Sequence, residues 1–421
     1  MSVESIDTLV VGAGQAGLAM SEHLGRAGIE HLVLERARIA ERWRSERWDS
    51  LVANGPAWHD RFPTLAFDGE PDAFAPRDAV VRYFETFAAR IAAPVRCGVE
   101  VTSATRRAGG PGFHVETSAG RIEARRIVAA TGPFQKPVIP PLVPTGASVT
   151  QLHSSAYSNP GALAEGAVLV VGAGSSGSQI ADDLNRAGRR VFLSIGPHDR
   201  PPRRYRGRDN VWWLGVLGRW EAAALTPGLE HVTIAVSGAR GGETIDFRRL
   251  AGQGITLLGM TRGFEDGRIG VAPDLAANIA RGDANYLAFL DDADAYVAAN
   301  GLDLPEEPQA RRIAPDPACL TDPVLSLDLA AEGITTIVWA TGYTLDFGWL
   351  KVDSFGPDGR PRHERGVGAE RGLYFLGLPW LSRRGSSFIW GVWHDARFIA
   401  DQIAIQRAYE AHAPASVPET V

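Results

Sequence analysis

The chain contains little cysteine. Only Cys97 and Cys319 occur among its 421 residues, and they lie far apart without forming a C-x-x-C motif. Neither a disulfide framework nor a dithiol redox centre is therefore expected, and the composition is typical of a reducing compartment, the cytoplasm. The sequence also lacks a run of about 18 apolar residues, and no basic, cleavable segment precedes the strand-like run at 6–11, so we expect neither a membrane span nor a targeting signal.

The chain also has no excess of positive charge. It carries 43 Lys and Arg against 49 Asp and Glu, a net charge of −6, so neither nucleic acid nor an anionic membrane is an expected partner. The ten histidines are scattered without ligand spacing, which predicts no metal site, and no G-x-S-x-G marks a hydrolase. With 45% hydrophobic and 22% charged residues, the composition is that of a globular protein, and the length predicts two or three domains.

Glycine, by contrast, is abundant, with 47 residues, and it marks an internal repeat. The segment IDTLVVGAGQAGLAMSEHLGRAG at 6–28 recurs as AVLVVGAGSSGSQIADDLNRAG at 167–188. Each copy is an apolar run, a G-x-G-x-x-G loop and a helical pattern that ends at Gly28 or Gly188, and a second apolar run follows at 31–35 or 190–194. This order predicts two β-α-β dinucleotide-binding folds. The repeated loop glycines are Gly12, Gly14 and Gly17 in the first copy and Gly172, Gly174 and Gly177 in the second.

The two copies differ where the second strand ends, which is where such folds select their cofactor. The first ends at Glu35, whose carboxylate can hold the ribose hydroxyls of FAD or NAD. The second ends at Ser194 without an acid, and a stretch rich in arginine follows at 200–208. Arginines without a competing carboxylate favour the 2′-phosphate of NADPH, with Arg203 and Arg204 as expected ligands. A solvated basic loop is the alternative interpretation.

A second pair of motifs indicates how the folds are connected. IVAATG at 127–132 and IVWATG at 337–342 are each a strand that runs into a turn of small residues, where a backbone can approach a ligand. A further strand is expected at 373–378 and a helix from about 385. We therefore predict an α/β protein with two Rossmann-like dinucleotide-binding domains, in which an FAD domain (1–155 and 315–421) is split by an inserted NADPH domain (160–310). The proline-rich stretch at 136–146 fits the outgoing linker.

Together these motifs resemble those of the class B flavin-dependent monooxygenases, which include the flavin-containing monooxygenases and the YUCCA-like indole-3-pyruvate monooxygenases. The paired GAGxxG loops, the two ATG turns, ERWRSERWDSLVANGP, HSSAY and GLYFLGLPW all occur in the family's order. One departure is in the fingerprint F-x-G-x-x-x-H-x-x-x-[FYW], which keeps His153 and Tyr157 but has Ala147 and Val149 in place of Phe and Gly. The chain is therefore more similar to bacterial relatives of the YUCCA-like branch, and the departure weakens the transfer of a substrate class.

The resemblance implies a set of cofactor-binding residues. Arg42, Trp43 and Trp48 match the stretch that packs along the flavin, while Leu378 and Ser386 would face its pyrimidine ring, near the start of the last helix. The other residues expected to bind FAD or NADPH are Gly12, Gly14, Gln15, Ala16, Gly17, Glu35, Arg36, Ala130, Thr131, Gly132, Gly172, Gly174, Ser175, Ser176, Gly177, Ser194, Arg203, Arg204, Ala340, Thr341 and Gly342.

Asn54 and His153 are the residues expected to act near the chemistry. Asn54 matches the Asn near the flavin's reactive edge in the family, although Asn-Gly-Pro is also an ordinary turn signal. His153 would either help control NADPH or serve as a structural hydrogen-bonding residue.

The resemblance implies an FAD-containing, NADPH-dependent monooxygenase that uses O₂ and a C4a-(hydro)peroxyflavin. Its small-molecule substrate would be an N or S nucleophile, a ketone or a 2-oxo acid. The alternatives are an FAD-dependent NADPH reductase or diaphorase and a non-catalytic redox sensor. A homodimer is an expectation from the family alone.

Overall fold

The computed structural model describes residues 3–223 and 233–412, and these fold into two compact units. Unit 1 takes in Met1–Ala40, Phe84–Pro133 and Leu345–Val421, and unit 2 takes in Glu41–Tyr83 and Phe134–Thr344. Each unit is thus assembled from segments that are far apart in the sequence. None of the helices in the described ranges has both the length and the apolar character that a membrane crossing requires.

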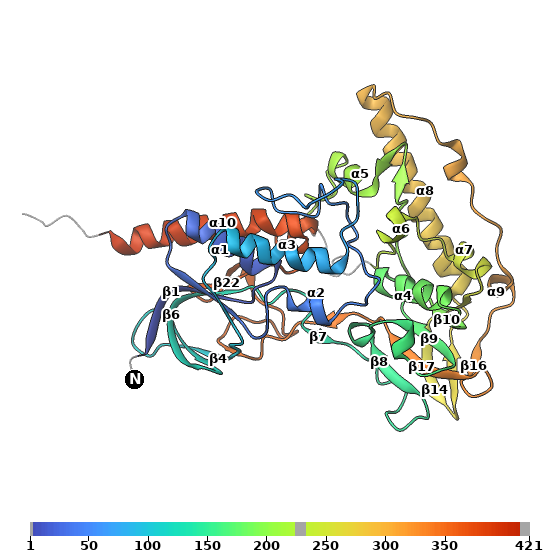
Figure 1. Cartoon of the computed structure of the whole chain (residues 1–421), viewed down its shortest axis with the longest axis horizontal. Helices are drawn as coiled ribbons and strands as arrows, with labels where there is room; N and C mark the ends of the chain where they lie inside the picture. The colour runs from blue at the N-terminus through green and yellow to red at the C-terminus, as the bar shows by residue number, and fades with distance from the viewer. Residues whose placement is uncertain (1–2, 224–232, 413–421) are drawn as a thin grey trace, which may run out of the picture. The chain divides into compact units, whose positions relative to one another are not determined.

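Unit 1 is built on a mixed sheet with strand order β19-β4-β5-β6-β1-β2-β3, and β22 also pairs with β6. The strands β1, β2, β3 and β6 run parallel, and helix α1 connects β1 to β2, as the first glycine repeat predicts. Helix α1 packs against α10 near the end of the chain (Figure 1). The bounds are β1 (Glu4–Val11), α1 (Gln15–Arg26), β2 (His31–Glu35), α3 (Arg77–Arg90, which begins in unit 2), β3 (Val95–Cys97), β4 (Val101–Arg106), β5 (Phe113–Thr117), β6 (Gly120–Ala129), β19 (Leu350–Lys351), β20 (His363–Glu364), β21 (Val367–Gly368), β22 (Leu373–Phe375) and α10 (Ile389–Ala411).

Unit 2 is built on a parallel five-stranded sheet with the order β13-β10-β9-β17-β8. Helix α4 connects β9 to β10, as the second repeat predicts. The antiparallel strands β14, β15 and β16 form a separate small sheet (Figure 1). The bounds are α2 (Glu41–Ser45), β7 (Lys136–Pro137), β8 (Thr150–His153), β9 (Ala167–Val171), α4 (Ser175–Arg186), β10 (Val191–Ser194), β11 (Arg204–Tyr205), β12 (Arg208–Asp209), α5 (Asn210–Val216), α6 (Ala239–Gly242), α7 (Phe247–Gly252), β13 (Thr256–Leu258), β14 (Thr261–Glu265), β15 (Arg268–Val271), α8 (Leu275–Asn300), α9 (Ala318–Thr321), β16 (Ser326–Asp328), β17 (Ile334–Trp339) and β18 (Tyr343–Thr344).

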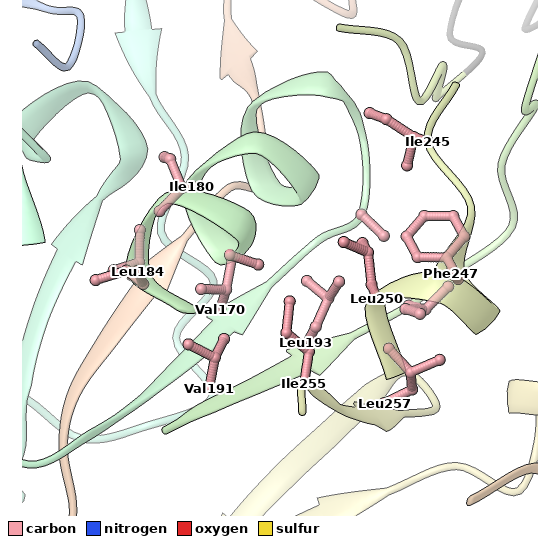
Figure 2. Packing of buried hydrophobic residues seen from close by; sticks show 14 of the residues in the cluster. Val170, Ile180, Leu184, Val191, Leu193, Ile245, Phe247, Leu250, Ile255 and Leu257 are labelled. Atoms are coloured by element: carbon pink, nitrogen blue, oxygen red, sulfur yellow. The ribbon is translucent and has the colours of Figure 1, made fainter. Parts of the chain in front are cut away.

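Both faces of the parallel sheet in unit 2 are covered by apolar side chains. All five residues of β9 are buried, which explains why AVLVV is a continuous apolar run without alternation. On one face, Ile180 and Leu184 of α4 and Leu250 of α7 lie over the strands (Figure 2). The predicted α/β class with two Rossmann-like folds is therefore confirmed. The strand residues under these helices include Val170, Val191, Leu193 and Leu257.

The division into units differs from the predicted domain boundaries. Residues 41–83, expected in the FAD domain, belong to unit 2, where Trp48 and Leu51 join the buried core cluster that contains Val170 and Ile180. Strands β8 and β17, also expected in the FAD domain, pair with each other, and β17 pairs with β9 in the sheet of unit 2. The reason is that each ATG turn follows the strand beside its own glycine loop: β6 pairs with β1, and β17 with β9. The second ATG turn is thus part of the repeat.

Candidate functional site

The first candidate site lies where β1 ends and α1 begins. Two of its glycines are required by the protein's own packing. Gly12 has a φ of +107°, and a Cβ on it would lie 2.7 Å from the carbonyl oxygen of Ala130, in the first ATG turn. A Cβ on Gly17 would lie 1.8 Å from the carbonyl oxygen of Gly12.

Gly14 differs from these two glycines. Its φ is −84°, which any residue adopts, and nothing lies within 4 Å of the position that its Cβ would take. In a β-α-β nucleotide fold the second glycine lets the pyrophosphate approach the backbone at the N-terminus of the helix. The open space beside Gly14 therefore fits the pyrophosphate of FAD.

Glu35 ends β2 and directs its carboxylate toward the glycine loop. The N–H of Ala13 donates to Oε2 over 2.9 Å, and the N–H of Ala37 donates to Oε1 over 3.0 Å. These two hydrogen bonds fix both oxygens at the end of the strand, where the ribose lies in this fold. Because each carboxylate oxygen can accept more than one hydrogen bond, Glu35 can still accept from a ribose hydroxyl.

The turn before α10 contacts the same glycine loop. The Nε2 of Gln15 donates to the carbonyl oxygen of Ser387 over 2.6 Å, and a Cβ on Gly377 would lie 2.8 Å from the Cβ of Ala16. Ser386 is fully buried, and its hydroxyl accepts from the backbone N–H groups of the two residues at 382 and 383. Ser386 thus stabilises the turn, and α10 begins at 389, four residues after the expected start at about 385. Leu378, the other residue predicted to face the flavin, is also buried.

The aromatic stretch expected along the flavin contributes to the core of unit 2. Trp48 is 4% exposed and lies in the same cluster as Tyr157 and the residues of α4, and Trp43 packs at the edge of that cluster. Arg42 pairs with Glu46 and donates to the carbonyl oxygen at position 135 over 3.2 Å. The structure therefore gives Trp48 a core role, which the motif alone did not indicate. Arg36 follows Glu35 and is exposed.

The second candidate site repeats the packing of the first. Gly172 has a φ of +104°, and a Cβ on it would lie 2.5 Å from the carbonyl oxygen of Ala340, in the second ATG turn. A Cβ on Gly177 would lie 1.7 Å from the carbonyl oxygen of Gly172. Gly174 departs from the pattern, because a Cβ there would lie 3.2 Å from the Cγ2 of Thr233.

Two of the residues predicted to select NADPH are buried and direct their side chains to other residues of the protein. Ser194 is 2% exposed, and its hydroxyl donates to the carbonyl oxygen of Gly259 over 2.9 Å. Arg203 is 1% exposed and forms an ion pair with Asp209. Arg204 is exposed on β11, so of the two arginines it is the one that stays a prediction for the 2′-phosphate.

Asn54 lies in a defined hydrogen-bond network within unit 2. The Nε2 of Gln179, on α4, donates to the carbonyl oxygen of Val236 over 2.9 Å and to Oδ1 of Asn54 over 3.0 Å. Because a carbonyl oxygen only accepts, the contact with Val236 identifies the nitrogen end of the Gln179 amide. The atom of Asn54 that faces Gln179 must then be the oxygen, so its NH₂ group is the end directed away from Gln179. Arg203 donates to the backbone oxygen of Asn54 over 2.6 Å.

His153 connects the end of β8 to the second ATG turn. Its Nε2 lies 2.9 Å from the carbonyl oxygen of Gly342, and its Nδ1 accepts from the N–H of Ser155 over 3.1 Å. These partners require the neutral tautomer with its proton on Nε2. Burial lowers the pKa of His153, which also favours the neutral ring. With both nitrogens bonded, His153 is placed as the structural alternative describes.

Two features of the sites had no sequence signal. Gln179 lies in SGSQIADD, where no motif distinguishes it from any other helical residue. Segment 233–237 has no glycine or charge pattern that indicates a contact with a nucleotide fold. Gln179 becomes visible because it donates to Asn54 and Val236, and the segment because it contacts Ser175 at the start of α4.

Known proteins resemble this chain over almost its whole length. A profile of the pyridine nucleotide-disulphide oxidoreductase family matches residues 9–206. A Geobacillus kaustophilus protein, described as an uncharacterized CzcO-like oxidoreductase, is 32% identical over 94% of this chain and 98% of its own length. The chain belongs to the CzcO-like oxidoreductases. It is thus an oxidoreductase, and the matching pyridine nucleotide-disulphide oxidoreductase profile implies binding of FAD and NAD(P)H.

The chain is also similar to monooxygenases in sequence or in fold. Indole-3-pyruvate monooxygenase YUCCA4 of Oryza sativa is 28% identical over 96% of this chain and 88% of its own length. The flavin-containing monooxygenase of Stenotrophomonas maltophilia has the same fold, with a TM-score of 0.66 and 19% identity over 97% of this chain and all of that chain. The family relationship predicted from the motifs is confirmed.

Proposed function

We propose that this chain is an FAD-containing, NADPH-dependent monooxygenase that places one oxygen atom of O₂ on a small organic substrate. The observation that supports this most directly is that the chain has two nucleotide folds and is similar to an indole-3-pyruvate monooxygenase over 96% of its length. When FAD is bound, it would accept hydride from NADPH and supply the chemistry with O₂.

In this proposal, unit 1 holds FAD. The open cradle at Gly14 and the N-terminus of α1 take the pyrophosphate, because unpaired N–H groups and the helix dipole favour negative charge there. Glu35 accepts from the ribose hydroxyls. The glycines Gly12 and Gly17 act indirectly, by bringing strand, loop and helix close enough to form the cradle.

Unit 2 holds NADPH in the same proposal, with its pyrophosphate at the N-terminus of α4. The absence of an acid at the end of β10 favours a 2′-phosphate over a free ribose, and Arg204 is the expected ligand. Asn54 presents its amide N–H groups as donors, so it would orient an acceptor oxygen without adding a group that titrates.

The proposed substrate class to test first is an aromatic 2-oxo acid, because the YUCCA relatives that match this chain over its length are indole-3-pyruvate monooxygenases. Amines, thiols and ketones follow, since the wider fold neighbours include a cyclohexanone monooxygenase.

An FAD-dependent NADPH reductase is the second candidate, favoured by the disulphide oxidoreductase profile that matches residues 9–206. The cysteines do not support a dithiol reductase. Cys97 and Cys319 are both free cysteines, and neither belongs to a C-x-x-C motif. Burial raises the pKa of both thiols, which favours the less reactive protonated form. A reductase for another acceptor would use the same two nucleotide sites.

Rapid mixing tests the proposal. The purified flavoprotein is reduced with one equivalent of NADPH and mixed with oxygenated buffer while the flavin absorbance is recorded. A spectral intermediate that precedes reoxidation, together with product from one of the substrate classes, is expected. Direct reoxidation with stoichiometric H₂O₂ across all these substrates would instead favour the reductase.

A further inference from the structure

The two glycine loops have the same backbone pattern but different surroundings. In the first loop, nothing lies within 4 Å of the position that a Cβ on Gly14 would take. In the second, the equivalent position of Gly174 lies 3.2 Å from the Cγ2 of Thr233 and 3.9 Å from the carbonyl oxygen of Ile234. The space that takes a pyrophosphate in this fold is thus open at one loop and lined by protein at the other.

The lining protein is the segment Thr233–Ser237, called the cover segment below. It is held to unit 2 by backbone bonds, since Asp199 donates its N–H to Thr233 over 2.8 Å and accepts from Ala235 over 2.9 Å. It is also held by helix α4, because Gln179 donates to the carbonyl oxygen of Val236 over 2.9 Å. Ala235 and Ser237 are buried, so these two residues lie against the fold, whereas Thr233 is exposed.

The hydroxyl of Ser175, at the first position of α4, commits its only proton to the cover segment. It donates to the carbonyl oxygen of Ile234 over 2.8 Å and accepts from the N–H of Val236 over 3.3 Å. A serine hydroxyl has a single proton to donate, so it cannot bond Ile234 and a phosphate oxygen with that proton at the same time. The carbonyl oxygen of Ile234 also carries partial negative charge, which opposes an anion at the helix N-terminus.

We propose that the cover segment closes the second glycine loop and leaves it when a dinucleotide binds. The Ser175 hydroxyl then donates its hydrogen bond to the pyrophosphate instead of to the carbonyl oxygen of Ile234. This inference rests on the proposed assignment of the second loop to NADPH. The cost of opening lowers the apparent affinity by the fraction of molecules that are open.

Opening of the cover segment also changes the surroundings of Asn54. The same Gln179 nitrogen that holds Val236 donates to Oδ1 of Asn54, and Arg203 donates to the backbone oxygens of both Asn54 and Ser237. Release of the segment removes one hydrogen-bond acceptor from Gln179 and one from Arg203. The state of the second glycine loop is therefore coupled to the position of Asn54.

The test compares Gln179→Ala with Asn185→Ala in the FAD-loaded protein. Gln179→Ala removes a bond that closes the cover segment. Asn185→Ala is the matched control, because Asn185 lies on the same helix and donates over 3.1 Å to the backbone oxygen of Gln253 instead. Calorimetric titration with NADP⁺ should show that the Gln179→Ala variant binds about fivefold more tightly than the wild type, because the loss of one hydrogen bond favours opening by about that factor. The Asn185→Ala control should bind NADP⁺ as the wild type does.

Hydrogen exchange gives a second readout that needs no turnover. The amides of Ala235 and Val236 should exchange faster when NADP⁺ is bound, the reverse of the protection that a ligand gives to a fixed pocket wall. Slower exchange with NADP⁺, or equal affinity of both variants for NADP⁺, would refute the proposed role of the cover segment. Flavin reduction by NADPH would be unaffected by that result. Absence of NADP⁺ binding and of NADPH-dependent flavin reduction in every variant would instead refute the proposed function, and the cover with it.

Discussion

Arg203→Ala is the substitution that best separates a structural arginine from a cofactor ligand. The side chain of Arg203 is 2% exposed, and that of its ion-pair partner Asp209 is 10% exposed. Arg203 also donates to the backbone oxygen of Asn54 over 2.6 Å, and its guanidinium lies 4.9 Å from the centre of the Phe74 ring. Removing it leaves a buried carboxylate without its counter-charge and a backbone oxygen without its donor.

The expected loss of stability follows from these contacts. Breaking a buried ion pair by removing one partner costs about 3–5 kcal/mol. In a domain of this size about 1 kcal/mol corresponds to about 2–4 °C in melting temperature, so Arg203→Ala should lower Tm by about 6–20 °C. Arg203→Lys should recover only part of this, because an ammonium keeps the charge but not the planar fork that reaches two acceptors.

The assay is thermal unfolding of the flavoprotein together with steady-state KM values for NADPH and NADH. Arg204→Ala is the matched control, since Arg204 is the neighbouring residue and is exposed. Arg204→Ala should leave Tm within about 1 °C of the wild-type value, as is usual for surface substitutions. It should raise the KM for NADPH by a much larger factor than the KM for NADH. Arg203→Ala should change both KM values together. An Arg203→Ala protein with the melting temperature of the wild type and a selective rise in the KM for NADPH would refute this reasoning.

Three further predictions concern the first glycine loop, a buried histidine and the amide network. Gly14→Ala should fold normally but release FAD, because its Cβ enters open space, whereas Gly17→Ala should not yield folded protein, because its Cβ would meet a carbonyl oxygen at 1.8 Å; FAD content and circular dichroism of both variants check this. Burial and two nearby arginines lower the pKa of His23 to about 4 from 6.5, so its contribution to stability is present above pH 6.5 and is lost as pH falls toward 4. Between pH 7 and pH 5 the free energy of unfolding should fall by about 2 kcal/mol more in the wild type than in His23→Leu. Urea unfolding at both pH values measures this, and an equal change in the two proteins would contradict it. Asn54→Asp keeps the oxygen that accepts from Gln179 but loses the amide donor, so the fraction of NADPH consumed that appears as H₂O₂ should rise with little change in Tm; an unchanged fraction would count against a role for the amide.

Much of the candidate site can be read from local sequence. The glycine loops are predictable because Gly12 and Gly172 need a positive φ, and Gly17 and Gly177 need a helix to approach the loop backbone. Glu35 is predictable because it ends a strand at a fixed spacing from the loop. These requirements act over about 25 residues, so they leave a motif.

The role of Arg203 could not be predicted in the same way. The sequence shows a cluster of arginines but not which of them are neutralised, because that depends on Asp209, Asn54 and Phe74 meeting at one buried position. The cover segment is a similar case, since Thr233 and Gly174 are brought together only by the fold of unit 2.

The sequence by itself determined the two β-α-β folds, the α/β class and the glycine loops proposed to bind dinucleotides, since all depend on short-range periodicity and backbone angles. Only the tertiary structure decided that β8 and β17 complete the second sheet and that Trp48 lies in a hydrophobic core. It also decided that the side chains of Arg203 and Ser175 bind other residues of the protein. The physical reason is that strand pairing, burial and charge neutralisation depend on partners far away in the chain. A residue's type shows which contacts it can form, and the fold determines which of them it forms.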